Sequence, residues 1–365
     1  MINKLTSPEH LQIAGIIAKK LHDLGVDATL LDFISEGPVV SVYRVAPKGR
    51  TKVSNIEALG SDFAVALGVE DVVVKRLAGD SGVSIFVPNK TRKNVSFSDV
   101  STTLWAQKEA LHVPLALGIN QTGSVCIDDL AELPHLLIAG STGGGKSTLL
   151  NAILTGLCLC KSAKDIQLVL SDTKGVEFQR FMGLGHLVME PANNVAETID
   201  QMDWIIEQVE KRLRTFSLAG VKNINEYMAP MPRIVLVIDE LADMLTDSRK
   251  QVEEKRTNAK IAAERLEFIV RRARAAGTYV IAATQRPSVN VVAGSIKANF
   301  PARITFKLPS RADSMTIIGE NGAEHLLERG DMLYYSPKGT IQRIHAPLVT
   351  EVELDAAIEM AVRKG

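Results

Sequence analysis

The segment Leu136–Leu150 reads LLIAGSTGGGKSTLL, and it decides the fold. An apolar run stops at a glycine-rich turn, and Gly-Lys-Ser leads directly into a second apolar run. Gly140–Ser147 matches the pattern G-x-x-x-x-G-K-[ST], between a predicted strand and a predicted helix. The glycines let backbone N–H groups surround phosphates, and the start of the helix adds its positive dipole end. The segment therefore predicts a nucleoside triphosphate site.

The residues around this loop give its expected ligands. The predicted nucleotide-binding residues are Gly140, Ser141, Thr142, Gly143, Gly144, Gly145, Lys146, Ser147 and Thr148. Lys146 would place its charge on the β and γ phosphates, and the Ser147 hydroxyl would join the shell of a Mg²⁺ ion. ATP and Mg²⁺ are the expected cofactors.

Apolar runs alternate with helical segments on both sides of the loop. The runs HLLIAG, IQLVLSD, RIVLVIDE, TYVIAATQ and ARITFKL begin at residues 135, 166, 233, 278 and 302. Near-continuous apolar runs are typical of strands that are covered on both faces. Their alternation with helices predicts an α/β domain with a mostly parallel sheet.

The first part of the chain has a different pattern. Residues 8–25 are spaced as an amphipathic helix, and 54–68 repeat the helical period. Short runs with strand character lie at 38–47, 71–79 and 83–89. We expect a small α+β subdomain over residues 1–115, the ATPase domain over 116–350 and a C-terminal helix over 351–365.

Composition excludes several classes of protein. The chain has 365 residues, with 46% hydrophobic and 23% charged residues and a formal net charge of +0. Contact with nucleic acid would therefore depend on local basic clusters. The start of the chain lacks the apolar segment of a signal peptide, and no uncharged run reaches the roughly 18 residues of a membrane span. We expect no membrane span and a cytoplasmic location, with the three cysteines reduced.

Polar residues end two of the predicted strands. Asp239 and Glu240 end RIVLVIDE, and Gln285 ends TYVIAATQ. The carboxyl edge of a parallel sheet is where such residues meet the phosphate loop. Asp239 would hold Mg²⁺, and Glu240 would polarise the attacking water. Gln285 would hydrogen-bond the γ-phosphate or that water, and the adjacent acids favour an ATP hydrolase over a small GTPase.

A basic run follows the two acids. Residues 249–274 contain nine basic and four acidic side chains, and a solvated helix face is the ordinary interpretation of such a run. Its arginines could also reach the ATP of a neighbouring subunit. The candidates for that role are Arg271, Arg272, Arg274 and Arg303, of which we select Arg274 and Arg303. Lys297, in a small-residue loop, could contact a phosphate backbone.

Several motifs occur together in a fixed order. They are PHLLIAGSTGGGKS, VLVIDELADML, RRARAAGTYVIAATQRPSV, GSIKANFPARITFKL, DSMTIIGENGAEHLLERGDMLY and RIHAPLV. In this order they resemble the motor region of the FtsK/SpoIIIE family of double-stranded DNA translocases. LLDFISEGPVVSVYRVAPKGRTKVSNIEALGSDFAVALG and VSIFVPNKTRKNVSF resemble the small N-terminal motor subdomain of that family. The resemblance covers about residues 25–350.

The resemblance implies a ring, usually a hexamer, of RecA-like P-loop ATPase domains around duplex DNA. It makes Gln285 the sensor and residues 246–255 and 291–297 the DNA-facing loops. The implied DNA-binding residues are Arg249, Lys250, Lys255 and Lys297. SDTKGVEF at 171–178 matches the segment after the second strand, with Lys174 and Glu177 in family positions. Ser171 and Thr173 depart from the family pattern there.

Larger departures concern what surrounds the motor. Full-length members of the family carry membrane spans before it and a winged-helix module after it, and neither is expected here. A motor of a phage or mobile element, or one served by a targeting or loading partner, is the resulting hypothesis.

The leading interpretation is an ATP-driven translocase on double-stranded DNA. The alternatives are a DNA-pumping ATPase for conjugation or virion packaging, and a nucleotide-switched DNA-binding scaffold. A helicase is less favoured, because aromatic stacking residues are lacking around the expected DNA-facing loops.

Overall fold

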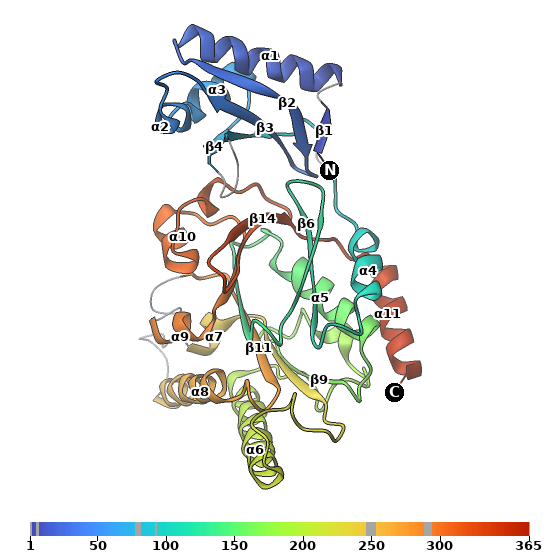
Figure 1. Cartoon of the computed structure of the whole chain (residues 1–365). Helices are drawn as coiled ribbons and strands as arrows, with labels where there is room; N and C mark the ends of the chain where they lie inside the picture. Colours follow the sequence, from blue (N-terminus) through green and yellow to red (C-terminus); the bar gives the residue numbers. More distant parts are fainter. Residues whose placement is uncertain are drawn as a thin grey trace. The chain divides into compact units, whose positions relative to one another are not determined.

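The computed structural model describes residues 2–4, 7–76, 82–91, 93–245, 253–287 and 294–364 (Figure 1). It contains two compact units. The first comprises Met1–Val95 and Ile119–Cys126, and the second comprises Ser96–Gly118 and Ile127–Gly365. The predicted domain boundary at residue 115 stays a prediction. The compact units change over between Val95 and Ser96, and the segment 119–126 belongs with the first unit.

The first unit is a helix-covered antiparallel sheet. Its elements are β1 (Ile2–Lys4), α1 (Pro8–Asp23), β2 (Ala28–Glu36), β3 (Val40–Pro47), α2 (Val53–Glu57), α3 (Gly60–Leu67), β4 (Val73–Lys75) and β5 (Val83–Pro88). The strand order is β1-β2-β3-β5-β4, and every neighbouring pair is antiparallel. Its core includes Ile17, Tyr43 and Phe63. The predicted helix over 54–68 is two short helices, because Leu59 leaves the helical conformation between them.

The second unit contains most of a nine-stranded sheet. Its strands are β6 (Pro114–Asn120), β7 (Val125–Asp129), β8 (His135–Ala139), β9 (Ile166–Ser171), β10 (Arg233–Ile238), β11 (Thr278–Thr284), β12 (Ala302–Thr305), β13 (Asp331–Tyr335) and β14 (Ile341–His345). The order is β7-β6-β14-β13-β12-β8-β11-β10-β9. From β12 to β9 all neighbours are parallel, whereas β13 pairs antiparallel with both β12 and β14. The five predicted strands and the mostly parallel sheet are confirmed.

The helices of this unit are α4 (Phe97–Ala106), α5 (Lys146–Cys160), α6 (Val195–Ala219), α7 (Leu241–Leu245), α8 (Glu253–Arg272), α9 (Gly294–Asn299), α10 (Arg311–Ile318) and α11 (Glu351–Lys364). The longest of these, α6, is capped at its start by Asn194, whose side chain accepts the N–H of Glu197. It is capped at its end by Gly220, where the backbone is left-handed. Figure 1 shows α5 and α11 across the sheet from α6 and α8.

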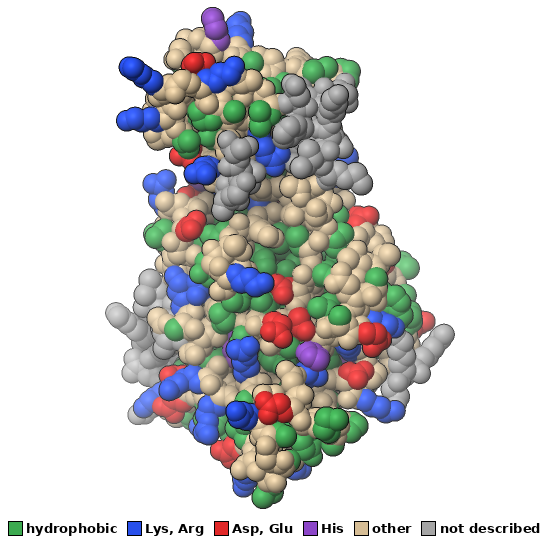
Figure 2. All heavy atoms as spheres, viewed as in Figure 1, with side chains coloured by type: hydrophobic (Ala, Val, Ile, Leu, Met, Phe, Trp, Pro, Cys, Tyr) green, Lys and Arg blue, Asp and Glu red, His purple; other side chains and the backbone are tan. Residues whose placement is uncertain are grey.

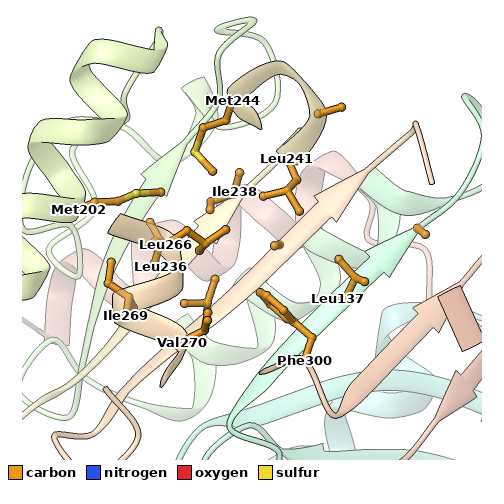
Figure 3. Packing of buried hydrophobic residues seen from close by; sticks show 14 of the residues in the cluster. Leu137, Met202, Leu236, Ile238, Leu241, Met244, Leu266, Ile269, Val270 and Phe300 are labelled. Atoms are coloured by element: carbon orange, nitrogen blue, oxygen red, sulfur yellow. The ribbon is translucent and has the colours of Figure 1, made fainter. Parts of the chain in front are cut away.

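Both faces of the parallel strands are buried. In β10, Ile234, Leu236 and Ile238 join a core cluster with residues of α6 and α8, while Val235 and Val237 alternate with them. Figure 3 shows this cluster, in which Met202, Leu266 and Ile269 close over the strands. Successive side chains of a strand point to opposite faces of the sheet. Because both faces are covered here, the strand sequences are apolar throughout. Truncating one such side chain to alanine costs about 2–5 kcal/mol.

Among the residues that the structure describes, none of the helices combines the length and the apolar character needed to cross a bilayer.

The buried side chain of His135 holds the start of β8 in place. His135, the first residue of β8, is 1% exposed. Its Nδ1 accepts the N–H of Val280 in β11 at 3.0 Å, which leaves Nε2 to donate to the carbonyl of Val270 in α8 at 3.1 Å. Burial lowers the pKa of His135 from 6.5 to about 4, and the bond to Val270 opposes that shift. The neutral imidazole therefore connects β8, β11 and α8.

The lowered pKa predicts a dependence of stability on pH. Between pH 6.5 and about 4, His135 is protonated in the unfolded chain and neutral in the folded chain. The free energy of unfolding therefore decreases as the pH is lowered through that window. We expect His135 to contribute a loss of about 2 kcal/mol at about pH 5 relative to about pH 7.5. Urea unfolding at both pH values would measure it, and His135→Gln should remove this component. Exposed His22→Gln is the matched control, and an equal slope in both variants would contradict the assignment.

Candidate nucleotide-binding and catalytic site

Hydrogen bonds attach the phosphate loop to the ends of β11 and β12, the two strands that flank β8. The N–H of Gly140 donates to the carbonyl of Thr284 in β11 at 3.2 Å. On the other side, both the N–H and the hydroxyl of Ser141 donate to the carbonyl of Lys307, at 3.2 and 2.7 Å. These bonds hold the loop at the carboxyl edge of the parallel strands, which is the usual ligand-binding edge.

The last glycine of the loop has no room for a side chain. Gly145 has a φ of +121°, and a Cβ there would lie 2.9 Å from the Cα of Gly330. The N–H of Gly330 donates to the carbonyl of Gly144 at 3.0 Å. The start of β13 therefore packs directly on the backbone at the point where α5 begins, and only glycine fits this approach.

Lys146 places a buried positive charge against the two predicted acids. Its side chain is 4% exposed, and its Nζ donates to the carbonyl of Asp239 at 2.8 Å. The same Nζ lies 3.3 Å from Oδ1 of Asp239 and 3.8 Å from Oε2 of Glu240. Oδ1 of Asp239 has this ion-pair contact but accepts no hydrogen bond. The structure thus brings together Lys146, Asp239 and Glu240, the three residues that the sequence places at this edge of the sheet.

Glu240 is held by three donors. Its Oε1 accepts the hydroxyl of Thr284 at 2.7 Å and the N–H of Ala242 at 3.1 Å. Its Oε2 accepts the N–H of Gln285 at 2.9 Å. The parallel register of β10 and β11 brings these groups together, because Ile238 pairs with Ala282. The carboxylate is 3% exposed and fixed in orientation. Thr284 carried no signal that distinguished it from other strand residues.

Gln285 reaches the phosphate loop through its side chain. Its Oε1 accepts the hydroxyl of Thr142 at 2.8 Å. The backbone of Gln285 bonds to Glu240, so this residue connects the acid and the loop.

The segment after β9 adds a third acidic side chain. Glu177 accepts the hydroxyl of Ser147 at 2.8 Å, which places it beside the start of α5. The turn that carries it is organised by Asp172, which is 1% exposed. Asp172 accepts the N–H groups of Lys174, Gly175, Glu177 and Phe178 at 3.2, 3.0, 2.6 and 3.2 Å. The role of Asp172 in holding this turn was not predicted, although Asp172 directly follows an apolar strand, as Asp239 does.

Burial and neighbouring charges change the ionisation of Asp239. Burial raises the pKa of Asp239, the Lys146 ammonium opposes this, and the charges of Glu177 and Asp172 raise it further. Carboxylate and hydroxyl oxygens are the ligands that Mg²⁺ prefers. The Oδ1 of Asp239, which is buried without a hydrogen bond, and the Ser147 hydroxyl therefore fit a Mg²⁺ ion.

The predicted basic residues are placed differently from one another. Arg303 donates to the carbonyls of Phe300, Ile317 and Lys297 at 2.9, 3.4 and 3.2 Å, and its guanidinium lies over Tyr335. Arg274 is exposed in the turn after α8. Lys297, in α9, donates to the carbonyl of Met315 at 3.2 Å. Arg249 and Lys250, and the side chain of Lys255, lie outside the described residues.

Sequence comparisons identify related proteins for both units. A model of the FtsK/SpoIIIE family matches residues 99–233, and a model of the FtsK alpha domain matches residues 3–89. The DNA translocase FtsK of Rickettsia typhi is 34% identical over 97% of this chain and 51% of its own length. That of Pseudomonas aeruginosa is 35% identical over 99% of this chain and 47% of its own. The chain thus spans about half the length of these relatives.

Solved structures show the same fold. The monomer form of the pCW3 conjugation coupling protein TcpA, with ATPgS, has a TM-score of 0.67 and 20% identity, covering 96% of this chain and 99% of that one. The cytoplasmic domain of the type VII secretion ATPase EccC of Thermomonospora curvata has a TM-score of 0.61 and 21% identity, covering 73% of this chain and 34% of that one. At these identities the likeness concerns the fold alone.

The Asp172 turn gives a prediction about local stability. Asp172→Ala removes one carboxylate that accepts four backbone N–H groups, so the turn over 172–178 should lose about 2–4 kcal/mol of local stability. Amide hydrogen exchange at residues 174–178 would measure this. Asp165→Ala, which removes a surface carboxylate bonded to Ser162, is the control and should leave those amides protected. Unchanged exchange in Asp172→Ala would show that the carboxylate does not hold the turn.

Proposed function

Since the chain belongs to the FtsK/SpoIIIE family, we propose that it is an ATP-driven translocase that moves along double-stranded DNA. One observation supports the ATPase part most directly. The phosphate-loop lysine meets Asp239 and Glu240 at the carboxyl end of β10, and Gln285, which follows the neighbouring strand β11, bonds to Glu240. A static nucleotide switch needs binding, whereas a fixed carboxylate and a fixed amide at this edge serve hydrolysis.

The residues of the site have separate roles in the proposal. Lys146 binds the β and γ phosphates, and it exchanges its contact with the Asp239 carbonyl for them. Glu240 orients and polarises the attacking water, and its three donors keep the carboxylate in place as the water loses its proton. Gln285, whose side chain bonds to Thr142 of the loop, contacts the γ-phosphate or the water.

Ser147 and Asp239 are the residues that would hold Mg²⁺. Bound Mg²⁺ would neutralise charge on the transferring phosphate. Glu177 bonds to the Ser147 hydroxyl and so sets its orientation.

The DNA part of the proposal rests on the family and on local charge. On the face drawn in Figure 2, Lys and Arg side chains are interspersed with Asp and Glu, in agreement with the net charge of +0. A broad basic face is therefore not seen on that side, and DNA contact is assigned to short segments. Of the proposed DNA-binding residues, Lys297 is described, and its ammonium bonds to a carbonyl at 3.2 Å that a phosphate could replace.

A ring of subunits, usually six in this family, is part of the proposal. In such a ring an arginine of one subunit completes the ATP site of its neighbour. Arg274 suits this role better than Arg303, because the Arg303 guanidinium already donates to three carbonyls of its own chain. Arg274 is exposed and needs no such exchange.

A DNA-pumping ATPase for conjugation or packaging is the second candidate. It would use the same motor and differ in the boundary and partner that receive the DNA. The likeness of fold to a conjugation coupling protein over nearly the whole chain keeps this candidate open. Movement along free linear duplex, without a partner, favours the first candidate.

The test is ATP turnover with and without linear duplex DNA. We expect strong stimulation by duplex and weak stimulation by single strands, and displacement of a triplex-forming strand should then report movement. Lys146→Ala should abolish nucleotide binding, and Glu240→Gln should lower turnover by about 10³-fold while nucleotide still binds.

Two results would contradict the proposal. Turnover that depends on Lys146 and ignores DNA would indicate a protein-export motor or a nucleotide switch. Turnover stimulated by duplex without strand displacement would indicate a DNA-binding scaffold.

Mixing variants tests the arginine across subunits. Arg274→Ala should lower turnover by about 10³-fold, because it removes charge from the transition state of the neighbouring site. When Arg274→Ala subunits are mixed with Lys146→Ala subunits, which retain Arg274, activity should recover. It should do so at the interfaces where a site with Lys146 meets a neighbour with Arg274. Arg271→Ala is the matched control, since Arg271 pairs with Glu267 on its own helix. A mixture that stays inactive would place Arg274 outside the neighbouring site.

A further inference from the structure

The turn before β13 holds an arginine in an unfavourable backbone conformation. Arg329 has a φ of +64°, and among the residues that the structure describes it is the one non-glycine residue with a positive φ. This left-handed region is unfavourable for a residue with a Cβ, and glycine or asparagine occupies it more readily. Backbone strain of this kind is typical of functional positions. The side chain of Arg329 therefore requires an explanation that the turn itself does not give.

The sheet order places this turn at the edge that carries the phosphate loop. β13 pairs antiparallel with β12, with Thr305 opposite Leu333, so β13 begins near the point where β12 ends. β12 is the parallel neighbour of β8, whose carboxyl end leads into the loop. In the order of strands, β13 and β10 lie on opposite sides of β8. Arg329 therefore approaches the loop from the side away from Asp239 and Glu240.

The residues on both sides of Arg329 contact groups that hold the loop. The N–H of Gly330 donates to the carbonyl of Gly144 at 3.0 Å. Oε1 of Glu328 lies 3.9 Å from the Nζ of Lys307, whose carbonyl bonds to the start of the loop. The side chain of Arg329 thus begins directly beside the phosphate loop.

A buried ion pair keeps the strained turn closed. The carboxylate of Asp331, which is 1% exposed, accepts two hydrogen bonds from Arg343, at 2.9 and 2.6 Å. The same carboxylate accepts the N–H of Leu327 at 2.8 Å, which closes the turn over residues 327–331. The turn is therefore fixed by contacts that do not involve the side chain of Arg329, and these contacts can hold its strained backbone.

The guanidinium of Arg329 is not engaged elsewhere. Arg329 is exposed, and within the described part of the chain its side chain has neither a hydrogen-bond partner nor an ion-pair partner. Arg303, by contrast, donates to three carbonyls of its own chain. A guanidinium presents a planar set of donors that matches phosphate oxygens and can bind them with two parallel hydrogen bonds. Arg329 can therefore contact a phosphate without breaking an existing bond.

A further positive charge would favour a triphosphate at this site. Lys146 lies against the carboxylates of Asp239 and Glu240, and Glu177 adds a third carboxylate at the Ser147 hydroxyl. A triphosphate brings several more negative charges to this acidic group. Like charges repel, and the repulsion is largest where water is excluded. Mg²⁺ would offset part of it on the side of the acids, and a cation on the opposite side of the loop would offset more.

We propose that Arg329 is a second cationic side chain that binds the phosphates of a nucleotide on the loop of its own subunit. The strained turn directs the guanidinium over the loop from the side of Gly144 and Gly145, so the bound phosphates lie between Arg329 and Lys146. The proposal rests on the proposed function, because a nucleotide must occupy the loop. It adds a residue whose contribution falls on the phosphates and not on the nucleoside.

The experiment measures the affinity of the full chain for ADP and for inorganic tripolyphosphate. Arg329→Gly should raise both Kd values about tenfold, since a charged hydrogen-bond donor to the phosphates is lost. Arg329→Lys keeps the charge and should keep most of the affinity. Lys164→Ala is the matched control. It removes an exposed lysine before the amino end of β9, at the opposite edge of the sheet, and should change neither Kd.

Urea unfolding separates this role from a purely structural one. Glycine takes the left-handed conformation without strain, so Arg329→Gly should keep or raise the midpoint of unfolding while it weakens both ligands. A lower midpoint together with weaker binding would assign Arg329 to the structure of the turn and would overturn the proposal.

The outcomes also distinguish this proposal from the proposed function. Unchanged Kd values in Arg329→Gly, with both values raised in Lys146→Ala, would overturn the assignment of Arg329 and leave the nucleotide site in place. A Kd raised for ADP alone would place the guanidinium on the nucleoside, which also contradicts the proposal. If Lys146→Ala weakens neither ligand, the proposed nucleotide site itself is wrong.

Discussion

The buried ammonium of Lys146 is the contact on which the rest of the site depends. Asp239 and Glu240 are both nearly inaccessible to water, and two carboxylates cannot be buried side by side without a cation. Lys146 lies within ion-pair distance of both and bonds to a carbonyl between them. The same charge is the one that phosphates would bind. The Lys146 ammonium therefore both stabilises the two buried carboxylates and provides the charge that would bind a triphosphate. This double role explains why its burial is tolerated.

The parallel register places that group. Lys146 can reach the acids only because β8, β11 and β10 are neighbours that end at one edge of the sheet. The same register puts Thr284 and Gln285 beside Glu240. Burial on both faces holds the strands in place, and the bonds of His135 add a connection at their opposite end. A shift of one residue between β10 and β11 would separate Glu240 from the hydroxyl of Thr284 and the N–H of Gln285.

The parts of this arrangement that could be predicted are those with a local pattern. The phosphate loop, the five apolar strands, and the acids and amide at their ends could be predicted because each combines an apolar run with a polar terminus. Strands β13 and β14, the Asp172 turn and the donor role of Thr284 could not. Two of these roles depend on neighbours distant in sequence, Gly330 on Gly144 and Thr284 on Glu240, whereas the Asp172 turn depends on the local backbone conformation of residues 172–178. Asp172 ends a strand as Asp239 does, yet it bonds to backbone instead of facing the loop.

Three residues of the phosphate loop and the start of α5 each contact a different strand end. Lys146 bonds to Asp239 after β10, Thr142 to Gln285 after β11, and Ser147 to Glu177 after β9. A triphosphate that binds the loop competes for all three side chains at once. Triphosphate binding would therefore change the contacts at the ends of β9, β10 and β11 together. The segments that follow those three strands would be affected by the same event. The chain after β10 leads to α7 and α8, and the chain after β11 leads to α9. Nucleotide binding is thus connected by short stretches of backbone to the segments that the family resemblance assigns to DNA.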